Sequence, residues 1–211
     1  MKFEEGIDEK YRQGVIDALA AIIETGNEAH RTVATAIRDS NMLLRVEPVS
    51  KVDASGRTGV INWFFTNRRI DDEKLSIHEA LGEVYMLFAA ETIDGGPRAV
   101  EGTFVHEGQH AYDFARMISS FSESDQNPLS VYDPTLYELE WNAHVAAGEY
   151  MLLVNKEEYI AEGIELLILG RNLEGCYIWH DGIKARLNDC YGLNDAHQGQ
   201  LTSEILRLRD R

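Results

Sequence analysis

Residues 102–117 read GTFVHEGQHAYDFARM, and this stretch decides how the rest of the chain is interpreted. Apolar residues recur through it at helical spacing, and Pro97, which directly follows two glycines, is typical of the first residue of a helix. We therefore expect a helix over about 97–119. His106 and His110 are four residues apart, so on this helix their side chains project from one face, one turn apart.

The five residues from His106 to His110 form an H-E-x-x-H pattern. Its spacing lets both imidazoles reach one zinc ion at about 2.0–2.1 Å. The Glu107 side chain points away from the helix face that carries the two histidines, but it stays beside the site. There it can move a proton from a metal-activated water to a leaving amine. Phe104 and Phe114 help to bury this helix, and burial makes unpaired imidazoles and carboxylates costly unless a metal compensates them. The competing interpretation is a chance match to the pattern.

A catalytic zinc site usually has a third protein ligand, and the next helix offers one. Residues 137–150, YELEWNAHVAAGEY, are rich in alanine and glycine, which allows another helix to pack close. Glu140 and His144 are four residues apart and share a face. Glu138 points about 200° away from Glu140, so only one of these glutamates can face the site. Glu138, with Asn142 four residues on, is the second choice.

Together the two motifs resemble the gluzincin branch of the zincin metallopeptidases. The matching residues are His106-Glu107-Gly108-Gln109-His110 and Glu140-Trp141-Asn142-Ala143-His144-Val145-Ala146-Ala147. The resemblance implies that His106, His110 and Glu140 bind zinc and that Glu107 is the catalytic base. His144 stands where the family has an acidic or amide residue, so it would support a ligand, hold the attacking water or stabilise an oxyanion.

The resemblance covers Val60–Val154 and departs from related families at one clear point. The third histidine and glycine that follow the pattern in metzincins are missing after His110. A small zincin α+β domain is implied, with a peptide substrate lying along a sheet edge above the metal. A ligand histidine could also donate a hydrogen bond to Asp113. The candidates for an oxyanion donor are Tyr112, Tyr137, Tyr177 and His180.

Hydrophobic patterning predicts an α+β fold, mostly helical with a small antiparallel or mixed sheet, in one domain over 1–211. Helices are expected in 1–40, strands in 42–76, the metal-site helices in 97–155 and further helices in 156–211. The expected strands are MLLRVEPV (42–49), GVINWFFTN (59–67) and a third within RRIDDEKLSI (68–77). The helical spacing of apolar residues predicts helices over IHEALGEVYMLFAAE (77–91) and EEYIAEGIELLILG (157–170).

Composition narrows the possible partners. The 211 residues include 36 acidic and 20 basic side chains, which give a net charge of −16 and argue against nucleic acid and anionic membranes as partners. The N-terminal residues are charged from Lys2 onward and lack an apolar signal region, so we expect a cytoplasmic protein, although signal-independent export would look the same. The oligomeric state is left open.

The sequence therefore favours a zinc-dependent metallopeptidase-like hydrolase that acts on a peptide or protein substrate. Glu107 would act as the general base and His144 would assist. The first alternative is a non-catalytic metal-binding or regulatory protein on the same scaffold. The second is a helical interaction protein with an accidental motif.

Overall fold

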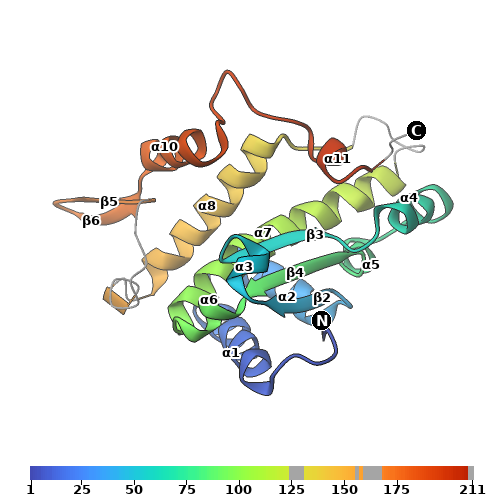
Figure 1. Ribbon diagram of the computed structural model, residues 1–211. Coiled ribbons are helices and arrows are strands. Elements are labelled where there is room, and N and C mark those ends of the chain that lie inside the picture. The colour runs from blue at the N-terminus through green and yellow to red at the C-terminus, as the bar shows by residue number, and fades with distance from the viewer. Residues whose placement is uncertain (124–130, 155–156, 159–167, 209–211) are drawn as a thin grey trace.

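The structure is a computed structural model that describes residues 1–123, 131–154, 157–158 and 168–208 (Figure 1). Helices provide most of the described elements: α1 (Glu9–Thr25), α2 (Glu28–Asp39), α3 (Val49–Val52), α4 (Trp63–Asp72), α5 (Ile77–Leu81), α6 (Ala90–Asp94), α7 (Pro97–Ser122), α8 (Leu136–Leu153), α10 (His180–Tyr191) and α11 (Thr202–Ile205). The strands are β1 (Lys2–Phe3), β2 (Leu43–Glu47), β3 (Gly56–Val60), β4 (Val84–Ala89), β5 (Leu169–Asn172) and β6 (Gly175–Ile178). The expected α+β class is confirmed.

One mixed sheet carries four of the strands in the order β1-β2-β4-β3. β1, β2 and β4 run parallel, whereas β3 pairs antiparallel with β4 and forms an edge of the sheet. Side chains alternate along β4, where Val84, Met86 and Phe88 are fully buried. Phe88 packs against Phe104 of α7, with ring centroids 6.1 Å apart, so the sheet and α7 share one core.

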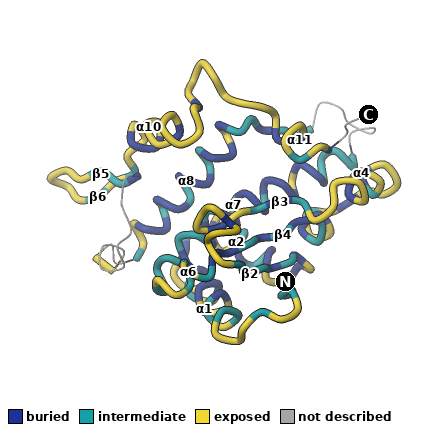
Figure 2. Tube along the Cα trace, in the orientation of Figure 1, coloured by how far each residue is buried: buried dark blue, intermediate teal, exposed yellow. Residues whose placement is uncertain are grey.

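Helix α7 lies at the centre of the molecule and contacts α1, α2, α5 and α8 as well as β3 and β4. Figure 2 shows that α7 and α8 are buried along much of their length, while α4, α10 and the β5–β6 hairpin are largely exposed. Gly108 allows the close approach of α2, because a Cβ added to it would lie 3.3 Å from Cδ1 of Ile37. Among the described residues, no helix combines the length and apolarity needed to cross a membrane.

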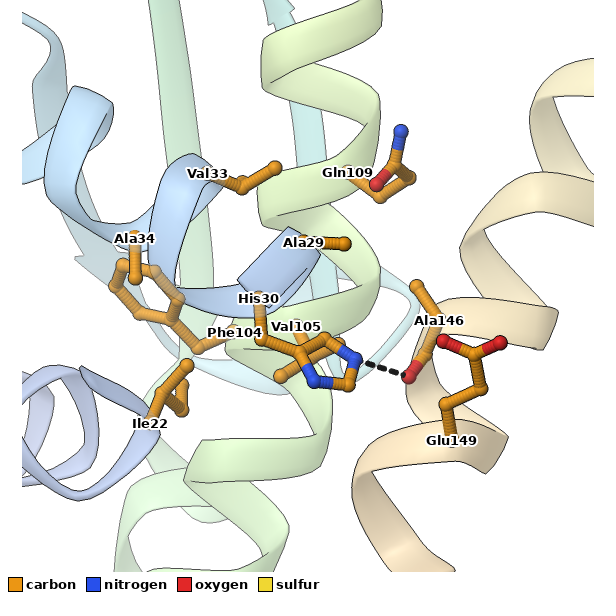
Figure 3. Close-up of a pocket in the computed structure, with 10 residues that line it drawn as sticks. All are labelled: Ile22, Ala29, His30, Val33, Ala34, Phe104, Val105, Gln109, Ala146 and Glu149. Carbon is orange, nitrogen blue, oxygen red and sulfur yellow. Dashed lines mark hydrogen bonds between the residues drawn. The ribbon is translucent and has the colours of Figure 1, made fainter. Parts of the chain in front are cut away.

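Helix α2 is also tied to α8 by a buried histidine (Figure 3). His30 Nδ1 accepts a hydrogen bond from the Asn27 amide at 3.2 Å, so its Nε2 carries the proton and donates to the Ala146 carbonyl at 2.9 Å. A cavity of about 30 Å³, roughly the share of one water molecule, lies beside this ring. Burial lowers the pKa of His30.

Several expected boundaries within 42–91 are wrong. The segment 42–49 contains β2, but 59–67 is strand only to Val60 and then enters α4. β2 and β3 do not pair with each other, because β4 lies between them. Asn62 starts α4 by accepting hydrogen bonds from the Phe64 and Phe65 amides. The expected third strand in 68–77 is instead the end of α4 and the approach to α5.

The helix expected over 77–91 is also wrong, because it is split into α5, the central strand β4 and the start of α6. The helical C-terminal part expected over 156–211 contains α10 and α11 but also the β5–β6 hairpin. Within the predicted helix 157–170, residues 159–167 lie outside the described part of the chain, and Leu169 and Gly170 belong to β5. Helices over 97–119 and 136–154 are confirmed as α7 and α8.

Candidate metal centre

Two helices bring three potential metal ligands together. His106 and His110 project from α7, and Glu140 projects from the adjacent face of α8. The two Nε2 atoms are 3.2 Å apart, and the Glu140 oxygens lie 3.6 Å from His106 Nε2 and 3.5 Å from His110 Nε2. In a tetrahedral site with bonds of about 2.0–2.1 Å, ligand atoms are about 3.3–3.4 Å apart. The group therefore has the spacing needed to hold one metal ion.

This cluster is buried and incompletely hydrogen-bonded. His110 and Glu140 are 7% and 8% exposed, while His106 is more open. Among the described residues, four buried side-chain nitrogen or oxygen atoms lack a hydrogen-bond partner, and three of them belong here: His110 Nδ1, Glu140 Oε2 and His144 Nε2. Buried polar atoms without partners are costly, and a cation between the three ligands would compensate part of that cost.

Electrostatics couple the three groups even without an ion. Burial opposes ionisation of the Glu140 carboxyl, but hydrogen bonding and charge interaction with both histidines outweigh it and hold the pKa well below its usual range. Burial would lower the pKa of His110, but Glu140 reverses this and raises it. Glu140 is thus a carboxylate near neutral pH, the form that ligates metal.

Glu107 lies on a different side of α7 and faces the sheet edge. Its carboxylate accepts a hydrogen bond from the Thr58 hydroxyl of β3 at 2.8 Å, and its backbone carbonyl accepts from the same hydroxyl at 3.1 Å. Gly56, also in β3, lies so close that an added Cβ would be 2.9 Å from Glu107 Cγ. The strand therefore fixes Glu107 beside the metal ligands.

The second chemically relevant side chain of α8 is His144. It is 6% exposed, and its ring centroid lies 4.7 Å from that of His106. Burial is the main cause that lowers its pKa to about 3, with neighbouring positive groups adding to the effect. His144 is therefore a neutral imidazole at physiological pH and offers one donor and one acceptor nitrogen.

A cleft of about 620 Å³ opens on one side of this cluster. His106, Glu107 and His144 line it, whereas His110 and Glu140 do not. Two residues from α10, Arg186 and Tyr191, complete the wall at this end. This volume falls within the range of about 300–1,000 Å³ that is usual for small-ligand sites. The metal group thus has one accessible side, and that side faces a cleft.

Glu138, the second choice for the third ligand, is excluded by its local contacts. It is exposed and forms a capping box with Thr135, whose amide donates to Glu138 Oε2 at 2.8 Å. Asp113 does not reach a ligand histidine through a hydrogen bond. It is buried and accepts hydrogen bonds from Gln109, Arg116 and Tyr132 instead.

None of the four oxyanion donors expected from the sequence lines the cleft. Tyr137 donates to Asp195, Tyr177 and His180 are exposed, and Tyr112 is half-buried elsewhere on α7. Sequence reasoning missed Tyr191. It lines the cleft and is 45% exposed, and burial together with the Glu140 carboxylate raises the pKa of the phenol. Tyr191 lies 51 residues after Glu140, and only the packing of α10 on α8 brings them together.

The chain was compared with known proteins, and no family model, curated protein or solved structure matches it. The assignment of a candidate metal site therefore depends on the residues and their geometry.

Proposed function

We propose that the chain is a zinc-dependent metallopeptidase-like hydrolase. The observation that carries this proposal is the close juxtaposition of His106, His110 and Glu140, with Glu107 on the same helical turn and a cleft on one side. Two histidines and a glutamate form a donor set known for catalytic zinc. The same donor types also serve non-haem iron, so direct metal analysis tests the choice of metal.

Zinc held by His106, His110 and Glu140 would polarise a carbonyl and lower the pKa of a water molecule. Glu107 faces the cleft and is fixed by Thr58, so it would accept the proton of the attacking water. When the C–N bond breaks, the same carboxyl group would return the proton to the leaving amine. His144 and Tyr191 line the cleft beside His106 and would donate hydrogen bonds to the carbonyl oxygen as negative charge develops.

The edge strand suggests how a substrate would lie. Among the described strands, β3 pairs only with β4, so its other edge can pair with an extended peptide. Thr58 and Gly56 bring this strand directly against Glu107. A peptide aligned on β3 would thus pass close to Glu107 and the metal group.

Metal content and peptide cleavage test this function separately. Purified wild-type protein should carry about one zinc ion per chain by elemental analysis, and His110→Ala should lose most of it. Glu107→Gln should keep the zinc but lose hydrolysis across a peptide library, because the carboxylate rather than the metal is removed. Full zinc occupancy without cleavage of any library member would leave a non-catalytic metal-binding protein, and absence of bound metal would reject the site.

A further inference from the structure

The cleft contains two arginines with different surroundings. Arg98 at the distal end is neutralised by carboxylates, since it donates to Glu101 at 2.5 Å and to Glu158 at 2.7 Å. Arg186 at the metal end is exposed, and it forms no ion pair or hydrogen bond within the described residues. In a chain with 36 acidic side chains, a guanidinium left unpaired in a metal-site cleft is available for a ligand.

The position of Arg186 places its charge close to the reaction centre. Arg186 lies on α10, just over one helical turn before Tyr191. Arg186 lines the cleft together with His144 and Tyr191, and its positive charge acts on both side chains. The His144 ring in turn lies 4.7 Å from that of His106. A group bound by Arg186 would therefore lie beside the carbonyl that the metal group holds.

The charge balance of the cleft limits what this group can be. The acidic residues that line it are Glu91 and Glu107, and Glu91 already accepts a hydrogen bond from the Val49 amide. One unpaired guanidinium in a cleft that also contains these carboxylates suits a single compact negative charge better than a dianion. The planar fork of arginine matches a carboxylate in a bidentate arrangement.

We propose that Arg186 binds a carboxylate of the substrate close to the scissile bond, and that the enzyme therefore prefers peptides with a carboxylate at that position. This inference rests on the proposed function. The carboxylate has two possible sources, the free C-terminus of a peptide or the side chain of an aspartate or glutamate. In either case Arg186 is a specificity residue that touches the substrate without taking part in proton transfer.

Binding of defined peptides tests this without turnover. The probes are dansyl-labelled tetra-alanine as the free acid, the same peptide as its C-terminal amide, and a series of amides with glutamate at each position in turn. Fluorescence anisotropy measures their Kd for zinc-loaded Glu107→Gln protein, in which the arginine is intact. We expect one class of carboxylate probe to bind about tenfold more tightly than the plain amide, as for a charge-assisted bidentate pair.

Further variants of the same protein assign the preference to Arg186. Arg186→Ala should abolish it, and Arg186→Lys should restore part of it, because the lysine keeps the charge but loses the fork. Lys184→Ala is the matched control: it removes one positive charge from the same helix, on a face about 200° away and paired with Asp195, so the preference should persist. Equal binding of all probes, no binding of any probe, or a preference that survives Arg186→Ala would overturn the inference.

The binding measurements also distinguish a failure of this inference from a failure of the proposed function. If the free acid is preferred, the substrate carboxylate is a C-terminus; if a glutamate-containing amide is preferred, it is a side chain. Hydrolysis by the wild-type protein without any carboxylate preference would reject the role of Arg186 and leave the hydrolase intact. A preference lost in Arg186→Ala, in a protein that cleaves nothing, would support carboxylate recognition by a non-catalytic site.

Discussion

Gly56→Ala should disturb the candidate site from the opposite side of the cleft. An added Cβ at this position would lie 2.7 Å from Thr103 Cγ2, 2.9 Å from Glu107 Cγ and 3.3 Å from the Leu87 carbonyl oxygen. Carbon atoms pack at about 3.5–4.0 Å, so β3 and α7 must separate by at least about 0.8 Å. Because Gly56 is buried between two packed elements, the strain cannot be relieved by movement into solvent.

The cost follows from these contacts. Overpacking of this kind costs about 1–3 kcal/mol, and the reduced freedom of the unfolded chain returns about 0.4–1 kcal/mol. A net loss of about 1–2 kcal/mol would lower Tm by about 2–8 °C in a protein of this size. The displacement of Glu107 should reduce hydrolysis by about two orders of magnitude, because misplacement by about 1 Å has effects of that size.

Gly59→Ala in the same strand is the matched control. Its Cβ would meet the ring of Tyr85 at 2.7–2.9 Å, but that contact involves the far end of a half-buried side chain that can move. Differential scanning calorimetry and cleavage assays should therefore show a clearly smaller loss than for Gly56→Ala. If Gly56→Ala keeps the wild-type Tm and turnover, or if both variants lose them equally, the close packing of β3 on Glu107 is refuted.

Three further perturbations act on single buried interactions. Thr58→Val removes the hydroxyl that donates to Glu107 at 2.8 Å and should cost about 1–3 kcal/mol in urea unfolding, whereas Thr58→Ser should recover most of it. Tyr150→Phe removes the donor to the buried Glu101 carboxylate, also at 2.8 Å, and should destabilise the protein by a similar amount without changing its zinc content. Burial depresses the pKa of His30 below its unfolded value of about 6.5, so its contribution to stability should be present above that pH and be lost as the pH falls through the folded pKa. His30→Asn should flatten this acid limb of the stability curve, and an unchanged slope would contradict the assignment.

The helices that carry the site could be predicted because their ends have clear chemistry. Pro97 begins α7 directly after Gly96, and Thr135 begins α8 with a capping box closed by Glu138. The same T-x-x-E pattern is visible in the sequence, and it could have removed Glu138 from the list of ligands. With both helices placed, the four-residue spacing of His106 and His110 was enough to predict their common face.

The sheet was harder to predict because its central strand is short and continuously apolar. VYMLFA over β4 is compatible with a strand or a buried helix, since periodicity alone does not separate them. In the neighbouring segment, 59–67, the sequence predicts a strand where the structure has the start of a helix. Trp63, Phe64 and Phe65 have strand-like composition, but all three are exposed, and the Asn62 cap makes them the first turn of α4. Local capping outweighed side-chain propensity there.

The far wall of the cleft could not be inferred from spacing. Arg186 and Tyr191 come from α10, which is separated from Glu140 by the β5–β6 hairpin and contacts the site only through α8. The hairpin packs directly on α8: a Cβ on Gly148 would be in van der Waals contact with Ile168 at 3.5 Å and with Ile178 at 3.6 Å. Packing between elements distant in the sequence determines these positions, and a single sequence gives no direct signal for it.

The surroundings of the H-E-x-x-H turn argue against an accidental match. Its residues face three different elements: the histidines face α8, Glu107 faces β3, and Gly108 allows α2 to approach. A chance pattern on a solvated helix would need none of these contacts. Here three buried polar atoms in and beside the cluster lack hydrogen bonds within the described part of the chain, although buried polar groups are normally satisfied. Such a cost is expected at a functional site, and a cation bound between the two helices would directly satisfy one of these atoms, Glu140 Oε2.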